Sequence, residues 1–277
     1  MTWFWLVVLA VFGAVMGSFA ACQVWRLRYK ETGKKSLGKF SVCLSCGKRL
    51  AWYENIPILS WVILRGRCRK CHEKIGVMEI LSEVGLMIVF VVLGVRYIHD
   101  GMTVMEILKL VALLVTMCGM WILLLYDAKW GELPGVVLTF CNACAIIYVI
   151  LKQWSLFLSS SKAGWEGVWQ TVMAIGILAG TYCLLYKFSN ERLVGGGDWI
   201  LCLAVALILG NWWLAIIELF LANLMASVAA GPLFLLRRQR GAAQKMRKMQ
   251  VHFGPFLVVV MVVVLLFDGF LLKALAF

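Results

Sequence analysis

The sequence predicts an all-α, polytopic integral membrane protein with about eight transmembrane helices and one small cytoplasmic loop domain stapled by zinc. Of its 277 residues, 63% are hydrophobic, and the mean hydropathy is +0.90. Apolar runs of about 20 residues, the length that crosses a bilayer as a helix, recur along most of the chain. Polar or Gly/Pro-rich stretches separate them, as expected for loops that leave the membrane. This pattern excludes a soluble globular protein.

Eight apolar runs fit this description. The sixth is short and is followed by Asn211-Trp212-Trp213, which predicts a tight turn with aromatic residues at the membrane interface. The last begins at Gly254-Pro255, and proline is tolerated in the first turn of a helix. The predicted spans are 3–25, 77–98, 103–126, 133–152, 166–187, 199–211, 212–236 and 253–275.

The distribution of Lys and Arg orients these spans. Loop 26–76 carries thirteen basic residues against three glutamates, and loop 237–250 carries six basic residues and no acid. The positive-inside rule makes both loops cytoplasmic, so that eight spans place the N-terminus outside. Much of the net charge of +13 then orients the protein and faces anionic lipid, and the bilayer rather than a nucleic acid is the expected partner. The resulting divisions are a first helix over 1–25, a zinc-binding loop domain over 26–76 and a helical bundle over 77–277.

Two Cys-x-x-Cys pairs in the first cytoplasmic loop predict a metal site. Four thiolates at this spacing provide a tetrahedral set for zinc, and four protein ligands leave no open position for catalysis. Reduced, unliganded thiols and two disulfides are the alternatives, although a reducing cytoplasm argues against disulfides. A loop this small buries little apolar surface, so a structural zinc would help it to fold. The predicted ligands are Cys43, Cys46, Cys68 and Cys71.

Two aspartates at helix ends are the candidate catalytic residues. Asp127 follows the third apolar run, and Asp198 closes Gly195-Gly196-Gly197-Asp198 before the sixth. The topology puts both on the cytoplasmic face, where a carboxylate beside hydrocarbon needs a partner or a function. Two close carboxylates share a proton, so that one activates a water while the other protonates a scissile carbonyl. An interfacial charge at a helix end explains Asp127 alone, and a flexible loop explains the glycines alone.

Several motifs, in order, resemble the bacterial type IV prepilin peptidase family. They are Gly17-Ser18-Phe19, Asn55-Ile-Pro-Ile-Leu-Ser-Trp61 between the two cysteine pairs, Asp127 with Pro134, Gly195-x-Gly-Asp198 and Phe253-Gly-Pro-Phe256.

The resemblance implies an intramembrane aspartyl protease of the Gly-x-Gly-Asp type. Such an enzyme removes the basic leader from prepilins or type II secretion pseudopilins at the cytoplasmic face of the bacterial inner membrane. Many members also methylate the new amino terminus with S-adenosylmethionine, for which this chain has no Gly-rich cofactor fingerprint. The residues that the resemblance makes candidates for lining the substrate are Gly195, Gly197, Glu83, Gly254 and Pro255.

Other interpretations stay open. The chain departs from the family pattern at Ala21, Gly135 and Ile200, where the family usually has Asn, Asp and Lys. An intramembrane aspartyl protease with another substrate, or one that does not methylate, is the first alternative. A non-enzymatic membrane scaffold whose zinc loop docks a cytoplasmic partner is the second. For Glu83, a charge favoured by the dipole at a helix N-terminus is the alternative to a place in the site.

Overall fold

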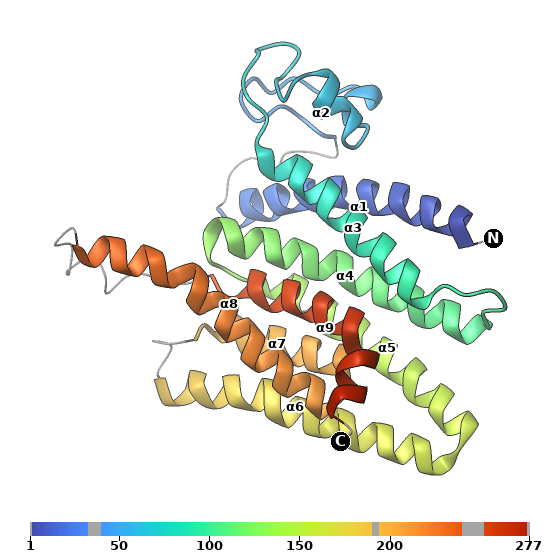
Figure 1. The fold of residues 1–277 in the computed structure, drawn as a ribbon. Helices are drawn as coiled ribbons and strands as arrows, with labels where there is room; N and C mark the ends of the chain where they lie inside the picture. The colour runs from blue at the N-terminus through green and yellow to red at the C-terminus, as the bar shows by residue number, and fades with distance from the viewer. Residues whose placement is uncertain (1, 33–39, 190–193, 240–251, 276–277) are drawn as a thin grey trace. The chain divides into compact units, whose positions relative to one another are not determined.

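The computed structural model describes residues 2–32, 40–189, 194–239 and 252–275. Every named element in these ranges is helical (Figure 1). The chain divides into two compact units, and helix α4 (Val104–Trp130) contributes to both. Residues 117–125 of α4 belong to the first unit, while 104–116 and everything after 125 belong to the second.

The first unit combines two long helices with the cysteine-rich loop. Helices α1 (Thr2–Glu31) and α3 (Val77–Tyr97) lie side by side (Figure 1). The loop between them contains a short 3-10 helix, η1 (Trp52–Asn55), and the five-residue helix α2 (Leu59–Ile63).

Glycine allows the close packing of α1 on α3. A Cβ atom at Gly17 would lie 2.5 Å from the carbonyl oxygen of Ser82 and 2.6 Å from the Cα atom of Glu83. The backbones therefore touch, which is the usual role of small residues between membrane helices. The hydroxyl of Ser82 donates to the carbonyl of Gly17 (2.7 Å) and accepts from the indole of Trp121 (3.1 Å), so this contact is polar as well as close.

The second unit is a helical bundle around a short buried helix. Helix α7 (Gly196–Leu209) packs against α5, α6 and α9, and Leu201–Leu209 is almost entirely buried. Helix α6 also packs on α5 and α8, and α9 packs on α8. The surrounding helices are α5 (Gly135–Ser159), α6 (Ser161–Ser189), α8 (Trp212–Gln239) and α9 (Gly254–Leu275).

The tight turn expected after the sixth apolar run is present between α7 and α8. Gly210 ends α7 in the left-handed conformation (φ 57°), which glycine adopts without steric cost. The side-chain oxygen of Asn211 then accepts from the backbone N–H groups of Trp213 (2.9 Å) and Leu214 (3.3 Å), which caps the start of α8.

The predicted fold class is confirmed, with one difference in the spans. Seven of the described helices are long and apolar enough to cross a membrane: α1, α3, α4, α5, α6, α8 and α9. The sixth predicted span is α7, which has only 14 residues. At a rise of about 1.5 Å per residue, it reaches about 21 Å, less than the hydrocarbon core of a bilayer. Helix α7 is therefore an apolar helix within the bundle that does not match the length of a full span.

Candidate active site and metal centre

Both candidate catalytic aspartates lie in the second unit, on different helices. Asp127 is in the last turn of α4 and is 4% exposed, and Asp198 is the third residue of α7. The two carboxylates interact electrostatically with one another. Asp127 is buried and Asp198 is half-buried, and two acids within electrostatic range of one another can share a proton.

A backbone N–H group holds each carboxylate by one oxygen. The N–H of Gly254 donates to Oδ2 of Asp127 (2.8 Å), and the N–H of Gly195 donates to Oδ2 of Asp198 (3.0 Å). Gly195 is the N-cap of α7, so Asp198 also caps its own helix, where the dipole favours a negative charge. Both side chains are thus oriented by fixed backbone donors.

Three of the candidate glycines fit the site closely. A Cβ atom at Gly254 would lie 2.7 Å from Oδ2 of Asp127, and one at Gly197 would lie 2.8 Å from the Cβ atom of Leu133. One at Gly195 would be 3.3 Å from Oδ2 of Asp198. Pro255 is the second residue of α9, and it directly follows the donor to Asp127. The structure therefore brings Gly195, Gly197, Gly254 and Pro255 together with the two aspartates in one unit.

Two aromatic residues near the aspartates were missed in the sequence. His252 interacts electrostatically with Asp127, and its ring lies against Gly131, four residues after that aspartate. Tyr182 of α6 is buried, and its ring centroid is 5.2 Å from that of Phe253. His252 could have been found in the sequence from its position directly before the motif Phe253-Gly254-Pro255. The sequence carries no comparable signal for Tyr182, which lies within a long apolar run.

The fifth lining candidate, Glu83, lies in the first unit. Its side chain is buried, and Oε2 accepts a hydrogen bond from the backbone N–H of Ile58 (2.6 Å). Ile58 has a positive φ of 63°, which is strained for a β-branched residue, so the hydrogen bond helps to fix this part of the loop. Glu83 is the seventh residue of α3, beyond the first turn where the helix dipole acts, so the dipole does not explain its position.

The four cysteines of the loop converge. Their sulfur atoms all lie within 4.8 Å of one another, and Sγ of Cys43 is 3.8 Å from Sγ of Cys71. Zn–S bonds of about 2.3 Å in a tetrahedron require sulfurs about 3.8 Å apart, so the four residues fit zinc. Cysteines 43, 46, 68 and 71 are all free of disulfides.

The two cysteine pairs are local repeats of one turn. In each, the N–H four residues after the first cysteine donates to its carbonyl, from Gly47 to Cys43 and from His72 to Cys68. Gly47 (φ 68°) and His72 (φ 57°) both adopt the left-handed conformation there. Such turns direct backbone N–H groups towards the sulfurs.

Backbone N–H groups favour the thiolate form of Cys68. The N–H groups of Cys71 and Lys70 lower the pKa of Cys68 to about 6. Lys48 pairs with Glu54 (2.9 Å) and also interacts electrostatically with Cys68, while the guanidinium of Arg49 lies 3.0 Å from the centroid of the Phe40 ring.

The chain is similar to known proteins both in its N-terminal part and over most of its length. Residues 11–97 match the model of the bacterial peptidase A24 N-terminal domain. Proteins named prepilin leader peptidase/N-methyltransferase are similar to the chain over longer stretches. The one from Pectobacterium carotovorum subsp. carotovorum is 27% identical over 96% of this chain and 94% of its own length. The one from Pseudomonas putida is 24% identical over 92% of this chain and 88% of its own.

Higher identity is confined to shorter alignments. The relative from Vibrio cholerae serotype O1 is 31% identical over 94 residues, which make up 32% of this chain and only 37% of that protein. No solved structure matches the chain.

Proposed function

We propose that this chain is a prepilin leader peptidase and that it removes the basic leader from prepilins or pseudopilins by aspartyl catalysis. Proteins named prepilin leader peptidase/N-methyltransferase are similar to it over 92% and 96% of its length, and its residues 11–97 match the bacterial peptidase A24 N-terminal domain. The observation that supports this proposal is the pair of carboxylates in the second unit, Asp127 and Asp198. They come from different helices, interact with one another and are each oriented by a backbone N–H group. A merely interfacial aspartate needs neither the second carboxylate nor the fixed donors.

The mechanism follows from this geometry. Since Oδ2 of each aspartate accepts a backbone N–H, we assign the two Oδ1 atoms to the shared proton and the attacking water. The ionised aspartate takes a proton from the water while the oxygen of this water attacks the scissile carbonyl carbon. The protonated aspartate donates its proton to the carbonyl oxygen. When the tetrahedral intermediate collapses, a proton passes to the leaving amine. The carboxylates titrate as a pair, so neither is assigned a fixed role.

The test is cleavage of a prepilin that carries a Gly–Phe junction after its leader. The protein is incubated with this substrate in proteoliposomes, and product masses are read by mass spectrometry. We expect the leader and the mature chain, with the break after glycine. Cleavage elsewhere would favour an aspartyl protease with another substrate, and no cleavage would favour a scaffold.

The contact between Gly254 and Asp127 leads to a prediction. Gly254→Ala should lower the cleavage rate by about 10- to 100-fold, because the new methyl group would displace Oδ2 of Asp127 from its N–H donor. The matched control is Gly135→Ala, which also alters the first residue of a helix but has no atom within 4 Å of the added Cβ. Equal rates for both variants in the prepilin assay would contradict the role given to Gly254.

Methylation of the new amino terminus is a second proposed activity, which a cavity in the first unit supports. This cavity of about 170 Å³ is lined in part by Glu54, Glu79, Glu83 and Trp25. Oε2 of Glu79 is buried with no hydrogen-bond partner among the described residues, while its Oε1 accepts from the indole of Trp25 (3.3 Å). Carboxylates beside an aromatic ring suit a cationic group, such as a sulfonium or an ammonium. S-adenosylmethionine would supply the methyl group. The measurement is the mass of the mature chain, which should increase by one methyl group.

We place the loop domain and both aspartates on the cytoplasmic side of the inner membrane. The basic residues of 26–76 and 237–250 support this side, although 33–39 and 240–251 lie outside the described residues, as do 190–193 of the connection before Asp198. The division into 1–25, 26–76 and 77–277 remains a prediction.

Membrane-impermeant labelling tests this topology. Reporters placed in 28–40 or after Arg237 should react only from the cytoplasmic side, because positive loops are retained there. Reporters at 155–162, where α5 turns into α6 through the extended Ser160, should react from outside. Labelling of 43–71 from outside would remove the argument that both aspartates share the cytoplasmic face.

A further inference from the structure

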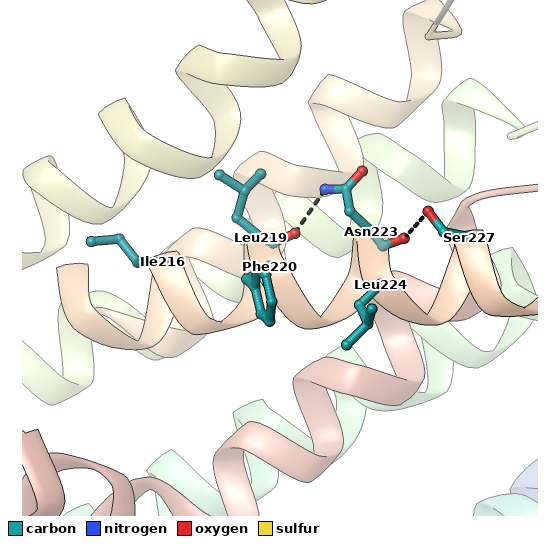
Figure 2. Close-up of a pocket in the computed structure, with 6 residues that line it drawn as sticks. All are labelled: Ile216, Leu219, Phe220, Asn223, Leu224 and Ser227. Carbon is teal, nitrogen blue, oxygen red and sulfur yellow. Dashed lines mark hydrogen bonds between the residues drawn. The ribbon is translucent and has the colours of Figure 1, made fainter.

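An open groove runs along α8, in the same unit as the two aspartates. It has a volume of about 490 Å³ and is lined by Ile216, Leu219, Phe220, Asn223, Leu224 and Ser227 (Figure 2). All six residues belong to a helix that is long and apolar enough to span the membrane. Phe220 is 66% exposed and Leu224 is 47% exposed, so the groove faces away from the core of its unit.

The groove has the form into which another helix packs. Its residues form two rows along the helix, and within each row the residues are four positions apart. The first row is Ile216, Phe220 and Leu224, and the second is Leu219, Asn223 and Ser227. Figure 2 shows Leu219 and Asn223 directed to one side of α8 and Phe220 and Leu224 to the other. The space between two such rows accepts the ridge of side chains of a second helix. The groove is about 16 Å long from Ile216 to Ser227, which corresponds to about three helical turns.

One row is polar, which is costly on a membrane-facing surface. Both N–H groups of Asn223 are used inside the unit, by the hydroxyl of Tyr182 (2.9 Å) and the carbonyl of Leu219 (2.7 Å). The amide oxygen of Asn223 and the hydroxyl oxygen of Ser227 are therefore the acceptors that this row offers. A lipid chain has no donor for them, whereas a helix with small polar side chains has.

Packed side chains connect the polar row to the aspartates. The hydroxyl of Tyr182 accepts from Asn223, and the ring of Tyr182 contacts that of Phe253 at a centroid distance of 5.2 Å and a tilt of 36°. The next residue, Gly254, donates to Asp127. Tyr182 also interacts electrostatically with Asp198. The Asn223–Ser227 end of the groove is thus the end near the candidate active site.

We propose that this groove binds the membrane-embedded helix of the substrate, which is largely apolar with small polar side chains facing Asn223 and Ser227, and directs the bond next to that helix to Asp127 and Asp198. The proposal rests on the proposed peptidase function and adds the surface that selects a substrate with a transmembrane segment. Its basis is the chain of contacts that runs from Asn223 in the groove through Tyr182 and Phe253 to the donor of Asp127. Binding of a second copy of this chain or of a lipid would make no use of that connection.

Photocrosslinking and kinetics in proteoliposomes test the groove. A photoreactive side chain replacing Leu224 should crosslink to the apolar segment of a prepilin, while one replacing Leu184 should not. Phe220→Ala with Leu224→Ala should raise KM about tenfold, the loss of a typical helix contact in a membrane, with little change in kcat. The matched control is Leu184→Ala with Phe188→Ala, an exposed pair on α6 with the same spacing and residue types.

The outcomes separate the groove from the peptidase function. The groove proposal would be overturned if the α8 double variant had an unchanged KM, or if the α6 double variant raised KM equally. Crosslinks from position 224 only to lipid or to a second copy of the chain would also overturn it. In those cases, cleavage by the wild-type protein would still support the peptidase. If the wild-type protein cleaves nothing, the peptidase proposal fails, and crosslinking of the prepilin still reports whether the groove holds it.

Discussion

Asp127→Asn and Asp198→Asn should each lower prepilin cleavage by about 10³-fold or more. Asparagine is nearly isosteric with aspartate, and its amide oxygen can still accept the N–H of Gly254 or Gly195. It cannot exchange a proton with water or with a scissile carbonyl. The loss should therefore appear in kcat, while the amount of membrane-inserted protein and the binding of substrate stay close to those of the wild type.

Asp100→Asn is the matched control, because Asp100 is exposed in the connection between α3 and α4. It should cleave at the wild-type rate. A near-normal rate in either Asp127→Asn or Asp198→Asn would show that the reaction does not use the pair. The double variant should cleave only slightly more slowly than each single variant, since the two carboxylates act as one unit.

Cys43→Ser combined with Cys46→Ser should remove the single zinc ion that we expect in the purified protein. Two ligands cannot hold the metal, and the binding free energy of structural zinc, on the order of 10 kcal/mol, stabilises small domains of this kind. The loop should then become sensitive to proteolysis, and methylation and substrate binding should fall with it. Elemental analysis and limited proteolysis are the measurements.

Cys141→Ser with Cys144→Ser is the control for this experiment, because it changes the same spacing of cysteines within α5. It should keep one zinc per chain and an intact loop. The pH dependence of any residual cleavage should be the same in both double variants, since it belongs to the carboxylates. Wild-type protein without zinc, or with a disulfide between the two cysteine pairs, would disprove the metal site.

The helices and the cysteine cluster were predictable because their signals are local. A run of apolar residues marks each long helix, and the structure extends most of them, as in α1, which continues to Glu31. The four cysteines could be grouped because Cys-x-x-Cys spacing already fixes each half of the site. The sixth apolar run was already short in the sequence, but hydrophobicity alone could not distinguish a short span from a helix buried among other apolar helices, which is what α7 is.

Contacts between distant segments could not be read from the sequence. Nothing around Asp127 indicates that Gly254 would donate to it, or that His252 would lie beside it. Tyr182 looked like any aromatic residue of an apolar helix until its hydrogen bond with Asn223 placed it between the groove and the aspartates. For Glu83, motif order suggested a place near the substrate, and its hydrogen bond to Ile58 is set by a loop whose conformation no pattern specifies.

The hydrogen bond from Gly254 to Asp127 joins residues that are 127 positions apart. A chain emerging from the ribosome therefore inserts α4 long before the residue that orients its aspartate has been made. Asp127 acquires that donor only once α9 begins, after the other described helices are in place. Asp198 finds its donor three residues away, so during biosynthesis a partly made chain carries both acids while the donor that orients Asp127 is still missing.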